Sequence, residues 1–167
     1  MSTFARLVAG AAIAAALTVG FAETSYAGPV NGGFTTNSIP RNDDGSAAGA
    51  VALPFTANFF GTSYTELYVN NNGNVTFNAP LGVYTPTGVA GGYSGLPIIS
   101  PFFADVDTRG ARSNLVQYGN GTYQGRTAFG VEWIDVGYYG AHDDLLNSFE
   151  LILTDRSDVN AGDFYIY

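Results

Sequence analysis

The sequence predicts an all-β protein, an antiparallel β-sandwich with a long Gly/Pro-rich loop and little helix. Three observations lead to this prediction. The 167 residues include 22 Gly, 11 Tyr and 12 Phe, a composition typical of short strands joined by turns. Apolar and polar residues alternate in several segments, as expected for sheets with one buried face. The connections between these segments are too short to hold crossover helices, which favours antiparallel pairing.

The clearest turn in the chain joins two predicted strands. Residues 66–70 and 74–77 both alternate, and Asn71-Asn72-Gly73 lies between them. An Asn-Gly pair readily supplies the positive φ angles that a tight hairpin needs. We therefore expect a hairpin over residues 66–77. The next stretch, residues 79–100, holds three Pro and five Gly, and it predicts a long surface loop.

The second half of the chain predicts further strands. Residues 115–118 and 127–136 flank the sequence GNGTYQG, which predicts a second hairpin. Residues 149–153 place Phe149, Leu151 and Leu153 on one apolar face, and Phe164 begins another strand. The best helix candidate is a turn or two over residues 141–147.

The amino terminus is typical of a signal peptide. Arg6 precedes an apolar run over residues 7–22, and Ser25-Tyr26-Ala27 provides small residues for cleavage. The run is shorter than the roughly 20 residues of a membrane-spanning helix. We expect residues 1–27 to be removed and the mature chain to begin at Gly28. The sequence thus predicts a secreted protein with no membrane insertion of the mature chain.

Composition limits the partners and the chemistry. The net charge is −8, and the six cationic residues are all Arg. Nucleic acid binding depends on clustered cations, so nucleic acid is not an expected partner. There is no Cys, which excludes disulfides, thiolate zinc sites and cysteine nucleophiles.

Asp105 and Asp107 are the main candidates for a metal or catalytic site, and both are weak candidates. Counted from Asp105, an EF-hand loop would have Arg109 at its fifth position and Val116 at its twelfth, where oxygen ligands belong. A calcium site formed with a distant loop remains open. The sequence predicts instead that both carboxylates accept backbone hydrogen bonds where a strand ends, that Arg109 and Arg112 neutralise them, and that no cofactor is bound.

Enzyme motifs are absent from the sequence. His142 is the single His and lies beside two Asp, and no Gly-x-Ser-x-Gly motif is present. If Asp105 and Asp107 shared one face of a strand, their carboxylates would lie roughly 6 to 7 Å apart, close to the spacing in some glycosidases. A glycoside hydrolase is therefore one alternative. Asn74 and Asn120 each begin a glycosylation sequon.

The order of several motifs resembles a known family, the nidogen-like extracellular (NIDO) domain. The stretches that carry the resemblance are NDDGSAAGAVALPFTANFFGTSYTELYVNNNGNVTF, PIISPFFADVDT, VQY, VEWIDVGYY and NSFELILT. They span about residues 31–167. The family occurs in nidogen, alpha-tectorin and mucin-4 and in exported bacterial proteins, and this chain resembles the bacterial type. The family has a further closing strand with a Trp-containing segment, so by resemblance residues 31–167 are a nidogen-like domain truncated near Tyr167.

The resemblance implies a secreted, non-enzymatic module for cell–matrix adhesion, whose partner is an extracellular matrix or cell-surface protein or glycan. It transfers no binding residues to this chain. A carbohydrate-binding module is the first alternative, because Tyr84, Tyr93, Tyr138 and Tyr139 could stack on sugar rings.

Overall fold

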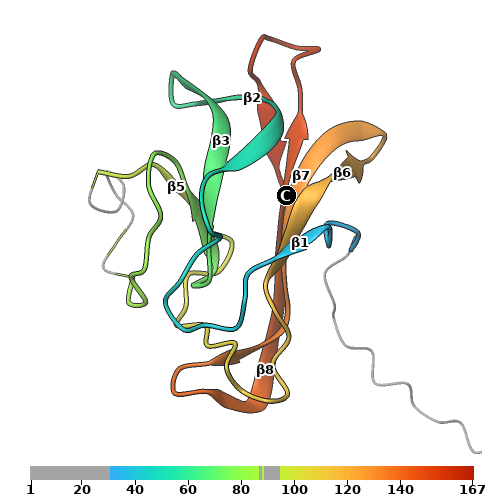
Figure 1. Cartoon of the computed structure of the whole chain (residues 1–167). Coiled ribbons are helices and arrows are strands. Elements are labelled where there is room, and N and C mark those ends of the chain that lie inside the picture. Colours follow the sequence, from blue (N-terminus) through green and yellow to red (C-terminus); the bar gives the residue numbers. More distant parts are fainter. Residues whose placement is uncertain (1–30, 87, 89–94) are drawn as a thin grey trace, which may run out of the picture.

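The computed structural model describes residues 31–86, 88 and 95–167, and these form two antiparallel sheets packed as a sandwich (Figure 1). No helix occurs in the described residues, and so none there could span a membrane. The strands are β1 (Asn37–Ser38), β2 (Val51–Phe59), β3 (Thr62–Asn70), β4 (Asn74–Thr76), β5 (Ile98–Ile99), β6 (Gln117–Tyr123), β7 (Arg126–Tyr138), β8 (His142–Asp155) and β9 (Phe164–Ile166). The predicted fold class is confirmed. The predicted signal peptide lies outside the described residues.

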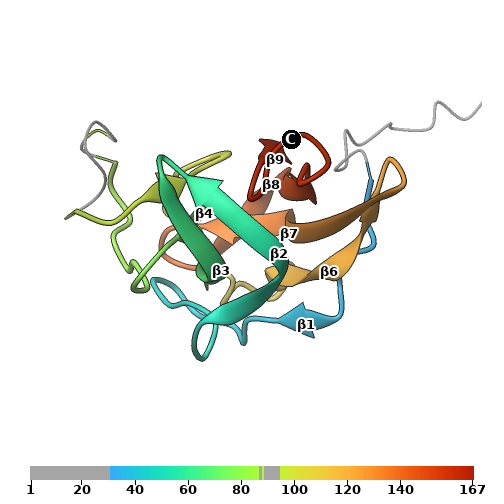
Figure 2. The same cartoon turned by 90° about the horizontal axis from the view of Figure 1, so that it is seen from above.

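The two sheets differ in size. One has the strand order β1-β6-β7-β8-β9 and the other the order β2-β3-β4-β5, and every pairing is antiparallel. Figure 2 shows the two layers from above, with β8 and β9 on the rear side of the molecule. The described part of residues 79–100 contains one strand, the short β5, in agreement with the predicted loop.

The main core lies between the sheets, where the alternating faces predicted from the sequence meet. Phe129, Val131 and Trp133 of β7 are buried there, together with Leu151 and Leu153 of β8. The indole ring of Trp133 stacks on Phe149 at 5.0 Å between ring centroids, and its Nε1–H donates to the carbonyl oxygen of Asn71 over 2.9 Å. Burial of an aromatic side chain with a satisfied polar atom is strongly stabilising.

The hairpin predicted at Asn71-Asn72-Gly73 is present between β3 and β4. Gly73 has a φ of +74°, a backbone conformation that favours Gly. The second predicted hairpin is also present, but its turn lies later than expected. Residues 119–123 continue β6, and the turn residues are Gln124 and Gly125, both with positive φ. The glycines in GNGTYQG therefore belong mostly to a strand.

The helix candidate over residues 141–147 is wrong, because this segment is the start of β8. The turn before it contains Gly140 and Ala141, both with positive φ, and it returns the chain against β7 so that His142 pairs with Tyr138. Hairpin pairing with the preceding strand β7 therefore overrides the weak local preference for a helical turn.

The alternation pattern did not indicate β2, which carries Pro54 near its middle. The register of β2 against β3 shifts between Ala52 and Ala57, so the Pro lies in an irregular part of the ladder. β2 is also an edge strand, where a missing N–H is tolerated.

A smaller apolar cluster covers the outer face of the five-stranded sheet. Phe34 packs there on Ala128 and Ile152. The ring of Phe34 lies so close to Gly130 that a Cβ at that position would come within 2.2 Å of it.

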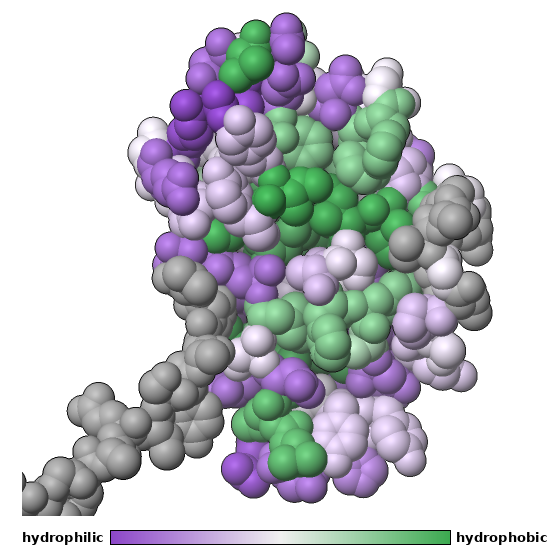
Figure 3. All heavy atoms as spheres, turned by 180° about the vertical axis from the view of Figure 1, so that it is seen from behind, coloured by the Kyte–Doolittle hydropathy of each residue, from purple (hydrophilic) through white to green (hydrophobic). Residues whose placement is uncertain are grey.

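Figure 3 views the rear side of the molecule, where hydrophobic residues gather in the middle and hydrophilic residues lie toward both ends.

Candidate functional site

Asp105 and Asp107 lie in the segment between β5 and β6, and the structure gives them different surroundings. They do not sit on a regular strand; Val106 between them forms a single antiparallel bridge with Tyr138 of β7. The condition for the glycosidase-like spacing, two carboxylates on one face of a strand, is therefore not met. Each Asp must be considered with the neighbours that the fold brings to it.

The carboxylate of Asp107 accepts backbone hydrogen bonds in a turn, as the sequence predicted. Its side chain is fully buried, and its Oδ1 accepts hydrogen bonds from the backbone N–H of Arg109 at 3.0 Å and from Nε of Arg109 at 2.9 Å. Its Oδ2 accepts from Nη2 of Arg109 and from the backbone N–H of Ala141, both at 2.6 Å. Asp107 thus joins the turn at residues 108–110 to the β7–β8 turn.

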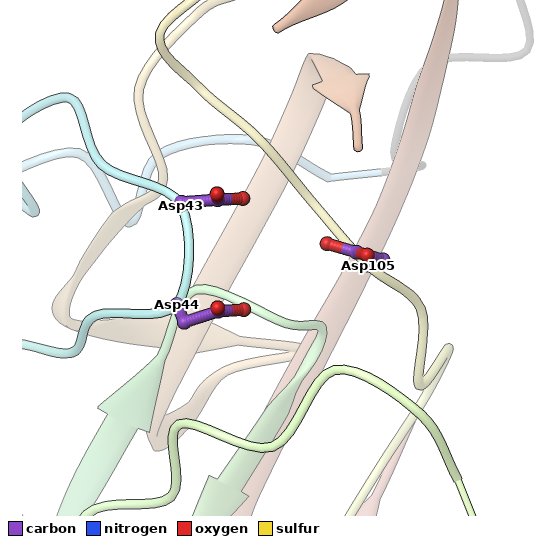
Figure 4. Close-up of side chains that lie close together, drawn as sticks. All are labelled: Asp43, Asp44 and Asp105. Carbon is purple, nitrogen blue, oxygen red and sulfur yellow. The ribbon is translucent and has the colours of Figure 1, made fainter. Parts of the chain in front are cut away.

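Within the described part of the chain, no turn amide donates to the side chain of Asp105, which lies instead against a distant loop. One carboxylate oxygen from each of Asp43, Asp44 and Asp105 lies within 4.8 Å of the others. Figure 4 shows the three side chains converging, Asp43 and Asp44 from one segment and Asp105 from another. We call these three residues the acidic cluster.

Two buried Asn side chains of the β3–β4 turn hold the loops of the acidic cluster together. Nδ2 of Asn71 donates to the carbonyl oxygens of Asp43 and Val106, and its backbone N–H donates to the carbonyl oxygen of Gly45. Oδ1 of Asn72 accepts from the backbone N–H of Val106 at 3.0 Å, while its Nδ2 donates to Oδ1 of Asp44 at 2.9 Å. The Asn-rich turn therefore sets the positions of both segments.

Arg109 forms an ion pair with the acidic cluster. Its Nη2 lies 2.7 Å from Oδ2 of Asp43 and 2.6 Å from Oδ2 of Asp107, so one guanidinium serves two carboxylates. The second expected cation, Arg112, contributes its backbone N–H, which donates to Asp143 at 2.8 Å.

The electrostatics separate the two Asp residues. Hydrogen bonds from the side chain of Arg109 hold the pKa of Asp107 below its ordinary value. Burial raises the pKa of Asp105, and the negative charges of Asp43 and Asp44 raise it further. Burial and repulsion from Asp107 also raise the pKa of Asp43, despite its ion pair with Arg109. Carboxylate oxygens are the ligands that calcium prefers, so the chemical capacity for a hard cation lies with the acidic cluster and not with the pair Asp105 and Asp107.

The remaining sequence candidates differ in their exposure to solvent. Nδ1 of the exposed His142 lies 2.6 Å from the carbonyl oxygen of Tyr139, and the hydroxyl of Tyr138 donates to Asp144. Tyr139 and Tyr84 are 62% and 52% exposed, and Tyr93 lies outside the described residues. Of the two sequons, Asn74 is fully buried and Asn120 is exposed.

Comparison with known proteins places the chain in a family. A family model described as NIDO related matches residues 18–160. The chain belongs to the NIDO-related family. Mouse alpha-tectorin is 31% identical over 134 residues, which cover 68% of this chain and 6% of that protein. Drosophila melanogaster nidogen is 26% identical over 137 residues, which cover 69% of this chain and 10% of that protein.

This NIDO-related chain therefore spans a tenth or less of the length of these curated relatives. No solved structure matches it. The family resemblance inferred from the NDDG, NNNG and ADVDT segments is confirmed. The same segments supply the residues of the acidic cluster and its Asn scaffold, because Asp43 and Asp44 lie in the first, Asn71 and Asn72 in the second, and Asp105 in the third.

The two Asp residues of the ADVDT segment are expected to respond oppositely to removal of their charge. Asp107→Asn should lower the free energy of unfolding by about 2 to 3 kcal/mol, because it removes charged hydrogen bonds to a buried carboxylate. Asp105→Asn in EDTA should leave stability unchanged or raise it by up to about 1 kcal/mol, because it relieves repulsion. Urea denaturation at pH 7 measures both.

The pH dependence provides a second check on this assignment. A lowered pKa means that the contribution of Asp107 is present above the ordinary carboxyl pKa and is lost as the pH falls through the folded-state value. Asp107→Asn should therefore flatten the acid limb of the stability curve. A loss of stability in Asp105→Asn equal to that in Asp107→Asn would contradict the assignment. A rise of several degrees in Tm with millimolar calcium, absent in Asp105→Asn, would contradict the expectation that no metal is bound.

Proposed function

We propose that this chain is a secreted, non-enzymatic interaction module that binds an extracellular matrix protein, as in cell–matrix adhesion. The observation that carries this proposal is the NIDO-related match together with the similarity to nidogen and alpha-tectorin, both extracellular matrix proteins. The predicted signal peptide is consistent with export. The chain shares only part of the length of these relatives, so their roles are a guide to the class of partner.

The surroundings of the sequence-derived catalytic candidates also favour a binding function. Both oxygens of Asp107 accept hydrogen bonds that tie two turns together, which suits a structural carboxylate better than a general acid. Nδ1 of His142 is engaged with a backbone carbonyl oxygen in an exposed turn. These contacts weigh against the glycoside hydrolase alternative.

Binding of the purified protein to matrix deposited by cultured fibroblasts and stripped of cells tests the proposal. We expect saturable binding that is lost after the matrix is digested with protease and retained after N-glycans and glycosaminoglycans are removed enzymatically. A serum albumin surface is the control for nonspecific adsorption. Binding lost on glycan removal would favour the carbohydrate-binding alternative, and no saturable binding by the folded protein would contradict the proposal.

A further inference from the structure

The tip of the β2–β3 hairpin carries an unusual residue for its position. Phe60 and Gly61 follow β2 with φ angles of +51° and +86°, the combination of a turn in which both central residues are left-handed. Asn-Gly and Gly-Gly are the favoured pairs in such a turn. A bulky aromatic residue at positive φ is uncommon because its Cβ crowds the backbone.

Packing does not account for the Phe at this position. The side chain of Phe60 is 93% exposed, the highest value among the large hydrophobic side chains in the described part of the chain. The hairpin is anchored instead by the preceding residue, Phe59. The centroid of its ring lies 5.2 Å from that of Phe77 and 6.3 Å from that of Phe164. The ring of Phe60 forms a T-shaped pair with the ring of Phe59, at 4.6 Å between centroids. Phe60 therefore combines an unfavourable backbone conformation with an unburied ring.

A loop with exposed apolar and charged side chains lies beside the hairpin that carries Phe60. The backbone N–H of Asn58 donates to the carbonyl oxygen of Gly162, so the loop over residues 156–163 lies beside the hairpin at one end of the sandwich (Figure 1). That loop exposes Val159. It also holds Asp158, which pairs with Arg126 and Arg156, each at 2.9 Å. Protein interfaces commonly combine an apolar anchor with a polar, charged rim of this kind.

We propose that the tip of the β2–β3 hairpin is a protein-docking element in which Phe60 inserts into an apolar pocket of the partner. The inference rests on the proposed function and names the surface that performs it. Strain and exposure at the same residue lower the stability of the free protein, and a contact made in the complex explains both. An anionic membrane is a poor occupant, because the chain has a net charge of −8 and no Lys to attract it.

The substitution Phe60→Asn separates docking from a structural role. Asn adopts the left-handed conformation more readily and completes a favoured Asn-Gly turn, so Tm should rise by about 2 to 5 °C. Binding to the cell-free matrix should fall at least tenfold. Leu145→Asn is the matched control, because it removes another large exposed hydrophobic side chain, 70% exposed, from β8. This control should retain binding within about twofold.

Each outcome decides the matter. A fall in Tm of Phe60→Asn would show that Phe60 supports the fold and would overturn the inference. Unchanged binding of Phe60→Asn, while the unmodified protein binds, would overturn the inference and leave the proposed function standing. No binding by the unmodified protein would overturn both. Phe60-dependent binding to phosphatidylserine vesicles would overturn the inference and identify a lipid surface as the partner of the hairpin tip. A Phe60-dependent dimer in sedimentation equilibrium would overturn it and identify a second copy of this chain as the partner.

Discussion

Replacing Gly73 by Ala is expected to lower the free energy of unfolding by about 3 to 5 kcal/mol. Gly73 has a φ of +74°, and a Cβ there would lie 1.8 Å from the carbonyl oxygen of Phe102. That oxygen belongs to the backbone, so the segment after β5 would have to move. A left-handed Ala alone costs roughly 1 to 2 kcal/mol, and the enforced displacement adds the rest.

Gly61→Ala is the matched control for the Gly73 substitution. Gly61 has a similar φ of +86°, but a Cβ there would meet nothing within 4 Å. We expect this variant to lose about 1 to 2 kcal/mol, the conformational part alone. Urea denaturation followed by the fluorescence of Trp133, the single Trp, measures both variants. Equal losses of unfolding free energy in the two variants would show that the contact with the Phe102 carbonyl oxygen does not contribute to the destabilisation at Gly73.

Glu150→Gln is expected to stabilise the protein at pH 8 by about 1 to 2 kcal/mol. The gain is no larger because the carboxylate is only partly buried and water screens its charge. Glu150 lies directly opposite Glu132 on the paired strands β8 and β7. Glu132 is buried and accepts a hydrogen bond from the backbone N–H of Phe34 at 2.8 Å. Among the described residues, Oε1 of Glu150 has no hydrogen-bond partner. Burial and then the charge of Glu132 raise the pKa of Glu150 to about 7.

The sign of the pH dependence follows from the direction of this shift. The folded protein holds the proton of Glu150 more tightly than the unfolded chain does, because the pKa of Glu150 is above its ordinary value of 4.5 in the folded state. The stability due to this proton is therefore complete below about pH 4.5 and is lost as the pH rises through about 7. Glu150→Gln removes this decline, and its amide can also donate toward Glu132.

Unfolding free energies at pH 4, 6 and 8 test the Glu150 prediction. The unmodified protein should lose stability over this range relative to Glu150→Gln, and the two should converge at pH 4. Glu66→Gln removes an exposed carboxylate from β3 and is the control for a change in net charge alone, expected to alter stability by less than about 0.5 kcal/mol. Parallel pH curves for the unmodified protein and Glu150→Gln would contradict the raised pKa.

Several features of the fold could be predicted from the sequence because they depend on local patterns. The alternation at Phe129, Val131 and Trp133 predicts a strand with one buried face, and these three residues lie in the main core. The turn at Asn71-Asn72-Gly73 could also be predicted, because the preference for a positive φ depends on the type of the residue itself, and Gly73 adopts one. Alternation and turn residues are properties of neighbouring positions in the sequence, so they can be recognised without knowledge of the rest of the fold.

Local patterns failed where pairing decided the structure. Residues 142–147 form the start of β8 because the preceding turn returns them against β7, and no feature of the segment itself specifies that partner. β2 accepts Pro54 because it lies at a sheet edge with an irregular register, which is known only once the sheet order is known.

The candidate site shows the same division most clearly. The sequence by itself determined the family, the β-sandwich and the presence of carboxylates in the ADVDT segment. The pairing of Asp107 with Arg109 was expected from the sequence, but only the tertiary structure decided that Asp105 joins Asp43 and Asp44. The physical reason is that the pKa of a carboxyl group and its capacity to bind ligands depend on charges and donors a few ångströms away in space. For Asp105 those neighbours are Asp43 and Asp44, about 60 residues earlier in the chain, whose loop is held in place by the buried amides of Asn71 and Asn72.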